Sequence, residues 1–102
     1  MITLVIRYTL DVRKLVEFER YARTWAEMIP RNEGKLVGYF VPTKIAGPTN
    51  IAYALIQFPN LTVYERYRDN LMRDPEVIRN IAEVENAGAI LIEERSILKQ
   101  VS

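Results

Sequence analysis

The chain has neither histidine nor cysteine among its 102 residues. Histidine is the usual general base near neutral pH and the commonest ligand of transition metals. Without either residue, one chain cannot form a Ser-His-Asp triad, a disulfide framework or the usual kind of structural zinc site. We therefore expect no metal and no cofactor, and a haem group would have to use tyrosine as its axial ligand.

The chain also has no surplus of charge of one sign and no long apolar run. Its 14 Lys and Arg residues and 13 Asp and Glu residues leave a net charge of +1, which gives no general attraction to nucleic acid or anionic lipid. No segment approaches the ~20 apolar residues of a membrane-spanning helix. The apolar N-terminus is interrupted at Arg7 and lacks the basic start of a signal peptide. We expect a cytoplasmic protein with no nucleic-acid partner and no membrane insertion.

What the sequence does contain is periodic apolar patterning over a length typical of one domain, residues 1–102. Alternating apolar residues predict a strand over Ile2–Leu10. Helical spacing then predicts a helix that Asp11 caps and that ends near Pro30 and Gly34; its apolar stripe is Leu15, Phe18, Ala22, Trp25 and Ile29. Its polar side offers two ion pairs, Glu19 with Arg23 and Glu27 with Arg31.

The second half of the sequence predicts three more strands and two short helices. The strands are expected over Lys35–Val41, Asn50–Phe58 and Ala89–Leu98, with Val37, Tyr39 and Val41 on one face of the first of these. One helix follows Asn60, with Leu61, Tyr64, Arg68 and Leu71 on one side, and the other starts at Asp74-Pro75-Glu76 and stops at Gly88. Tyr64-Glu65-Arg66-Tyr67 also echoes Phe18-Glu19-Arg20-Tyr21 in the first helix, which suggests two related halves.

This order predicts an α+β fold of the ferredoxin-like β-α-β-β-α-β type, a four-stranded antiparallel sheet with helices on one face. The open face should be polar if it meets water. In the third strand, however, Ile51, Tyr53 and Leu55 are as apolar as the residues between them. We therefore expect a second copy of the chain to cover the open face, in a homodimer.

Aromatic residues provide the candidate binding site. Tyr8 and Tyr39 lie in predicted strands and Trp25 lies on the apolar stripe of the first helix, so the three can line a pocket for an apolar or aromatic small molecule. Ordinary core packing is the alternative for each of them. Arg7 should point the opposite way from Tyr8, toward the dimer interior, where it could anchor a ligand or pair with a glutamate.

One further pair is expected on the last strand. Glu93 and Arg95 are two residues apart and therefore share a face, where structural pairing is the favoured interpretation.

The sequence resembles the NIPSNAP family of the dimeric α+β barrel superfamily. The resembling segments include Arg7-Tyr8-Thr9, Gly34-Lys35-Leu36-Val37-Gly38-Tyr39-Phe40, Asp74-Pro75-Glu76 and Glu94-Arg95-Ser96, and they span almost the whole chain. The resemblance implies a ferredoxin-like subunit, a dimer with facing sheets and a small protein whose biochemical role is undefined. The functions left open are binding of a small apolar or aromatic molecule, cofactor-independent oxygenation or isomerisation, and a purely structural interaction module.

Overall fold

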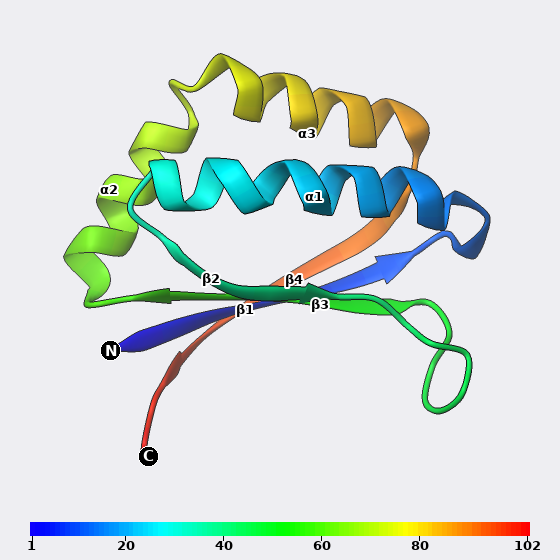
Figure 1. The fold of residues 1–102 in the computed structure, drawn as a ribbon, viewed down its shortest axis with the longest axis horizontal. Helices are drawn as coiled ribbons and strands as arrows, with labels where there is room; N and C mark the ends of the chain where they lie inside the picture. Colours follow the sequence, from blue (N-terminus) through cyan, green and yellow to red (C-terminus); the bar gives the residue numbers. More distant parts are fainter.

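A computed structural model describes the whole chain, residues 1–102. Four antiparallel strands form one sheet in the order β2-β3-β1-β4, and three helices cover a single face of it (Figure 1). The elements are β1 (Ile2–Leu10), a 3-10 turn (Val12–Lys14), α1 (Leu15–Arg31), β2 (Lys35–Phe40), β3 (Ile51–Phe58), α2 (Leu61–Leu71), α3 (Pro75–Ala87) and β4 (Ile90–Lys99). This arrangement confirms the ferredoxin-like α+β fold.

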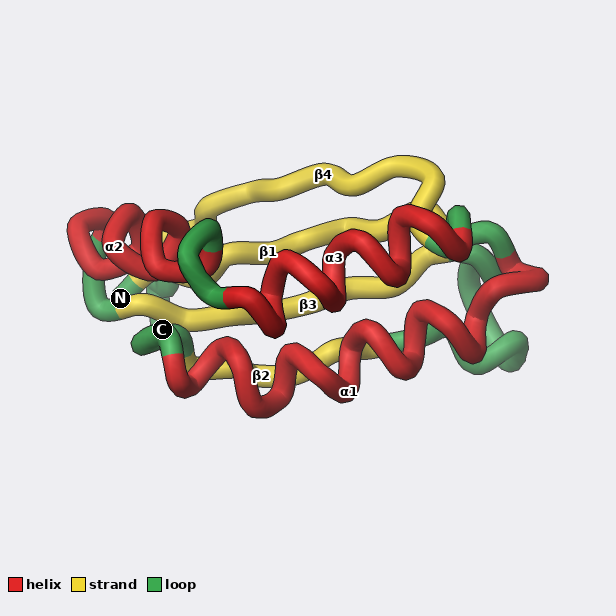
Figure 2. The backbone as a smooth tube through the Cα atoms, turned by 90° about the horizontal axis from the view of Figure 1, so that it is seen from above, coloured by secondary structure: helices red, strands yellow, loops and turns green.

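The helix layer leaves one edge of the sheet uncovered. Seen from the helix side, α1 lies over β2 and α3 lies over the two central strands, whereas β4 lies outside both (Figure 2). Beyond Ile90, every residue of β4 is exposed. The β4 edge is therefore the part of the sheet that the helix layer covers least.

The core follows the alternation predicted for β1. Leu4, Ile6, Tyr8 and Leu10 are all buried beneath the helices. Their partners Ile56, Ala54 and Ala52 in β3 are buried on the same face. The residues between them, including Arg7, point to the opposite, open face.

Strand β2 does not keep the alternation that the sequence predicted. Leu36 pairs with Ile56 and Gly38 pairs with Leu55, so Val37 is an extra residue in the ladder. This β-bulge puts Leu36 and Tyr39 on the helix side and leaves Val37 half exposed. The prediction that Val37 and Tyr39 share a face was therefore wrong, because a bulge shifts the side-chain period by one residue.

Helix α1 buries a wider face than its predicted stripe. Phe18, Ala22, Trp25 and Ile29 are buried as expected, but so are Tyr21 and Met28. The reason is that α1 contacts α3 as well as the sheet (Figure 2). A helix with two neighbours needs an apolar surface broader than a single stripe.

The turn after α1 shows why glycine stands at position 34. The left-handed residue at the helix end is Glu33, with φ of 75°, and its carboxylate pairs with Arg66 of α2 at 2.7 Å. At Gly34 a Cβ would lie 2.8 Å from Cγ2 of Ile29. Gly34 is therefore required by the close approach of the chain to α1, while Glu33 takes the backbone conformation that glycine usually supplies.

Helix α2 packs through a side that only partly matches the predicted one: Tyr64 and Leu71 pack against the core, but Leu61 and Arg68 do not belong to it. Its buried residue is Tyr67, whose ring centroid lies 4.8 Å from that of Phe58 at the end of β3. The Tyr64 ring, which stacks on that of Tyr67, also contacts Phe58 with centroids 5.2 Å apart, whereas Leu61 and Arg68 are exposed. The tertiary contact with Phe58 decides the orientation, since a short helix with a weak apolar stripe has little preference of its own.

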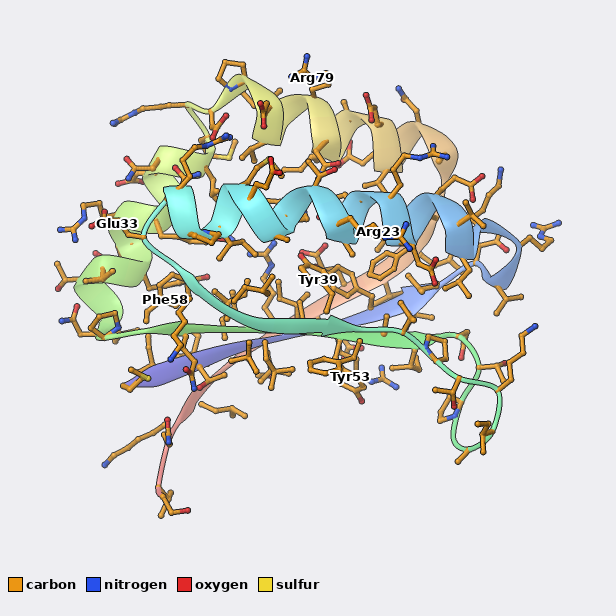
Figure 3. All side chains as sticks on the ribbon, viewed as in Figure 1. Arg23, Glu33, Tyr39, Tyr53, Phe58 and Arg79 are labelled. Carbon is orange, nitrogen blue, oxygen red and sulfur yellow. The ribbon has the colours of Figure 1, made fainter.

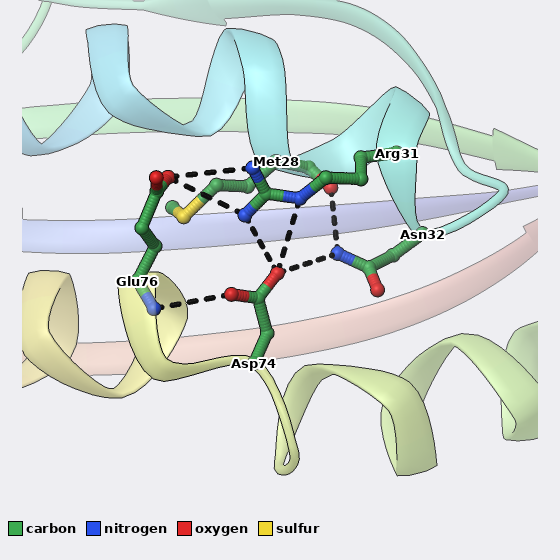
Figure 4. Close-up of polar contacts among 5 residues, drawn as sticks. All are labelled: Met28, Arg31, Asn32, Asp74 and Glu76. Carbon is green, nitrogen blue, oxygen red and sulfur yellow. Dashed lines mark hydrogen bonds and ion pairs between the residues drawn. The ribbon is translucent and has the colours of Figure 1, made fainter.

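The junction between α1 and α3 is held by a polar network around Asp74 (Figure 4). Asp74 caps α3 by accepting a hydrogen bond from the backbone N–H of Glu76, at 3.1 Å. Its other oxygen accepts from Nη2 of Arg31 at 2.6 Å and from Nδ2 of the buried Asn32 at 3.3 Å. The predicted pair of Glu19 with Arg23 forms at 3.6 Å, but Arg31 binds Asp74 and Glu76 instead of Glu27.

Acidification is expected to weaken this junction. The Arg31 guanidinium, followed by Asn32 and the α3 backbone N–H, outweighs partial burial and holds the pKa of Asp74 below its usual range. The stabilisation is present above the pKa of an unfolded Asp, about 3.9, and is lost as the pH falls through the lower folded value. Thermal unfolding followed by circular dichroism should show Asp74→Asn melting below wild type at pH 7, with the gap closing at pH 2.

The matched control for that measurement is Asp69→Asn, which removes an exposed aspartate of α2 that makes no ion pair. Asp69→Asn should melt like wild type at both pH values. Equal melting of wild type and Asp74→Asn at pH 7 would contradict the role given to Asp74.

Candidate functional site

A cavity lies between the helix layer and the sheet, on the side next to β4. Its outer chamber has a volume of about 240 Å³ and is lined by residues of α1, α2, α3 and β4: Tyr21, Trp25, Arg68, Leu71, Met72, Ile81, Glu85, Glu93 and Arg95. A small inner chamber of about 20 Å³ reaches the sheet and is lined by Leu4, Ile6, Tyr8, Tyr21, Trp25, Tyr39, Ile56, Tyr67, Leu71 and Arg95. The two chambers adjoin, because Tyr21, Trp25, Leu71 and Arg95 line both.

Aromatic rings from both layers form the walls of the inner chamber. The hydroxyls of Tyr8 and Tyr39 lie 3.3 Å apart and share a hydrogen bond. Phe18 supports the Tyr8 ring edge-on, with centroids 5.0 Å apart. Tyr21 and Trp25, one turn apart on α1, meet edge to face at 6.0 Å and an interplanar angle of 80°. Such edge contacts are favourable arrangements for aromatic pairs and give the chamber a defined shape.

The tyrosines of the cavity are neutral at physiological pH. Burial raises the pKa of Tyr21 to about 12, and it raises the pKa values of Tyr8 and Tyr39 well above their usual range. Burial also raises the pKa of Tyr67. Because a protonated phenol donates a hydrogen bond and is a weak base, these residues can orient an acceptor but cannot remove a proton from a ligand.

The indole N–H of Trp25 is a buried donor without a partner. Trp25 interacts with the hydroxyl of Tyr21 and lowers the pKa of that residue against the effect of burial, but its N–H does not reach hydrogen-bond geometry. Buried polar groups are nearly always paired. A bound molecule can supply the acceptor for this donor provided that the ring shifts to open the nitrogen, which is closed to solvent in this structure.

The ion pair of Arg95 with Glu93 lies where the two chambers meet. On β4, Nε and Nη2 of Arg95 donate to the same oxygen of Glu93, at 2.9 and 2.6 Å, which confirms the predicted pairing. Burial alone would lower the pKa of Arg95, but the bonds to Glu93 and the negative charge of that residue raise it overall. Arg95 therefore keeps its positive charge at the cavity.

The structure brings three of the four candidate residues together. Tyr8, Trp25 and Tyr39 line the inner chamber, and Trp25 is 5% exposed with its ring toward the sheet. Arg7 lies on the open face, where Nη1 binds a carboxylate oxygen of Glu94 at 2.8 Å. Figure 3 shows Tyr39 on the helix side of the sheet and Tyr53, the β3 partner of Arg7, on the other side. As predicted, the cavity that includes Tyr8 does not include Arg7.

The sequence prediction missed three residues of the cavity: Tyr21, Tyr67 and, as a lining residue, Arg95. Two signals pointed to the tyrosines. Tyr21 lies four positions before Trp25, on the same side of a helix, and the repeated Glu-Arg-Tyr motif ends in Tyr21 in one half and Tyr67 in the other. Both repeated tyrosines line the inner chamber. Arg95 could not be identified in the same way, since its contact with the cavity depends on where α2 and α3 lie.

Nothing in the fold gathers three or more acidic side chains into a group that could hold a metal ion. None of its helices is both long and apolar enough to cross a membrane.

Comparison with known proteins defines the family. The NIPSNAP model matches residues 3–102. A NIPSNAP family protein from Agrobacterium tumefaciens has a similar structure, with a TM-score of 0.86 at 24% identity over 99% of this chain and 94% of the other. A NIPSNAP domain protein from Burkholderia xenovorans has a TM-score of 0.82 at 16% identity, covering 100% and 96% of the two chains.

The fold is shared more widely. SnoaB, a cofactor-independent oxygenase from Streptomyces nogalater, has a TM-score of 0.65 at 17% identity, covering 99% of this chain and 93% of its own. No curated protein matches the sequence significantly. With a family match that spans nearly its whole length and a ferredoxin-like fold common to its structural relatives, this chain belongs to the NIPSNAP family.

Proposed function

We propose that residues 1–102 are one NIPSNAP-like domain, working as a homodimer, whose cavity binds a small apolar or aromatic molecule through Tyr8, Trp25 and Tyr39. The observation that carries the proposal is the unpartnered N–H of Trp25, a residue that lines a largely apolar cavity of aromatic and aliphatic side chains. An outer chamber of about 240 Å³ lies just below the usual range of ligand pockets. A molecule with one or two rings suits that volume.

The homodimer is supported by the open face of the sheet. Half-buried Val5 and Leu55 lie side by side near its middle, and Ile51, Phe40, Tyr53, Ile92 and Leu98 add apolar surface on the same face, together with the pair of Arg7 and Glu94. Exposed apolar surface of this kind is typical of an interface between subunits. In such a dimer the pair of Arg7 with Glu94 would lie inside the barrel, away from the cavity.

Ligand binding can be followed through Trp25 itself, because it is the only tryptophan of the chain. We expect 4-nitroanisole, a flat neutral aromatic that quenches indole emission, to quench Trp25 in a saturable way. Ile81→Phe should weaken this binding by about tenfold or more, roughly 1.4 kcal/mol, since the added ring fills the outer chamber that Ile81 lines. Fluorescence titration of the two proteins gives the two dissociation constants.

The matched control is Ile78→Phe, the same substitution on the exposed side of α3. This variant should bind 4-nitroanisole like wild type. Quenching that never saturates, or equal losses in the two variants, would show that the probe does not occupy the cavity.

A further inference from the structure

We propose that the ligand of this cavity carries an oxyanion, as a phenolate, an enolate or a carboxylate, and that this oxygen enters the inner chamber and binds Arg95 and the N–H of Trp25. The inference rests on the proposed binding function and specifies its ligand. It also assigns the anion-binding role to Arg95, on the helix side of the sheet, and not to Arg7.

The sizes of the two chambers indicate which part of a ligand each receives. The inner chamber, at about 20 Å³, has room for roughly one water-sized group and none for a ring. The outer chamber is about twelve times larger and is the only one of the two that can hold a ring. Trp25 and Arg95 line both chambers, so they stand where an oxygen attached to the ring would pass into the inner one.

The chemistry of the inner chamber favours a negative oxygen. Arg95 is its only charged lining residue, whereas Glu85 and Glu93 line the outer chamber alone. The shared bond between Tyr8 and Tyr39 uses one hydroxyl hydrogen and leaves the other free to donate. The chamber therefore combines a positive charge with several donors. The carboxylate of Glu93 lies outside the chamber and is bound to Arg95, but its negative charge raises the pKa values of Tyr8, Tyr21 and Tyr39, so the direct bond to Arg95 has to outweigh that repulsion for an anion to bind.

Arg95 has donors to spare for a ligand. Its two hydrogen bonds to Glu93 come from Nε and Nη2. The third nitrogen of the guanidinium, Nη1, has no hydrogen-bond partner. The pair with Glu93 fixes the guanidinium at the junction of the chambers. A ligand oxygen there would receive a charge-assisted hydrogen bond, which is about twice as strong as a neutral one.

A bound phenol should therefore ionise more readily than a free one. The probe is 4-nitrophenol, whose phenolate absorbs visible light and whose ring matches that of 4-nitroanisole. A neighbouring Arg lowers the pKa of an acid by about 1–3 units. We expect the absorbance titration of protein-bound 4-nitrophenol to shift down by at least about one pH unit, so that the phenolate binds about tenfold more tightly than the phenol.

Three variants separate the roles of the arginines. Arg95→Gln should abolish the downward shift, and Arg95→Lys, which keeps the charge, should retain part of it. The matched control is Arg7→Gln. Like Arg95, Arg7 lies in a strand and pairs with a glutamate, but it lies on the open face, so this variant should leave the pKa shift of the bound phenol unchanged. Unaltered binding of 4-nitroanisole to Arg95→Gln would show that this variant keeps its fold and its cavity.

The outcomes distinguish the two proposals. If both probes bind but 4-nitrophenol ionises at its ordinary pH or higher, the oxyanion proposal is overturned and the binding function stands. If Arg7→Gln abolishes the shift and Arg95→Gln does not, the anion binds on the open face and the assignment to Arg95 is wrong. If neither probe binds, both proposals fail together.

Discussion

Replacing Trp25 with alanine is expected to lower the free energy of unfolding by about 3–5 kcal/mol, the usual cost of removing a large buried aromatic ring. The side chain is 5% exposed and packs edge to face against Tyr21. We expect a value toward the lower end of that range for two reasons. The ring borders an existing cavity, so some of its surface has no packing partner, and its N–H already lacks a hydrogen bond.

Chemical denaturation at a fixed protein concentration measures this effect, since the stability of a dimer depends on concentration. The control is Val16→Ala, on the exposed side of the same helix, which should change stability by less than about 0.5 kcal/mol. A loss below about 1 kcal/mol for Trp25→Ala would mean that the ring contributes little to the core.

Replacing Leu55 with glutamate is expected to convert the proposed dimer into a monomer. Leu55 lies on the open face in the middle of the sheet, opposite Val5 of β1 and Gly38 of β2. In a dimer with facing sheets, a carboxylate there would be buried without a partner, which costs several kcal/mol for each subunit. Light scattering coupled to size exclusion should give about twice the 11.9 kDa chain mass for wild type and one chain mass for the variant.

Val16→Glu, on the solvent side of α1, adds the same charge outside the expected interface and should remain dimeric. Circular dichroism must show native secondary structure in both variants for the comparison to hold. A wild-type monomer at micromolar concentration, or a Leu55→Glu variant that stays dimeric, would refute an interface formed by the open faces.

Local sequence signals predicted the elements well. Asn60 and Asp74 each accept a hydrogen bond from a backbone N–H at the start of α2 and α3. Asp11 was expected to cap the first long helix, but it caps the 3-10 turn Val12–Lys14 instead, and α1 begins after Lys14 without a side-chain cap. Gly88 ends α3 in the left-handed conformation expected of a C-terminal glycine. These features depend on neighbouring residues only, and that is why they can be recognised without the fold.

The errors arose where a distant contact outweighed the local pattern. Arg31 could pair with Glu27 on its own helix, but the packing of α3 brings a carboxylate oxygen of Asp74 within 2.6 Å of it. That carboxylate is already held in place by the backbone N–H of Glu76. The bulge at Val37 changed which side chains of β2 face the helices. The contact with Phe58 buried Tyr67 of α2. None of these contacts leaves a periodic signal in the sequence.

By itself, the sequence determined the order and type of the elements, the burial of Trp25 and the absence of histidine and cysteine chemistry, because composition and short-range periodicity contain that information. Only the tertiary structure decided that Tyr21, Tyr67 and Arg95 join Tyr8, Trp25 and Tyr39 around one cavity, while Arg7 faces away from it. These side chains come from five elements spread over almost the whole chain. Their meeting depends on how three helices pack on the sheet, which no local pattern specifies.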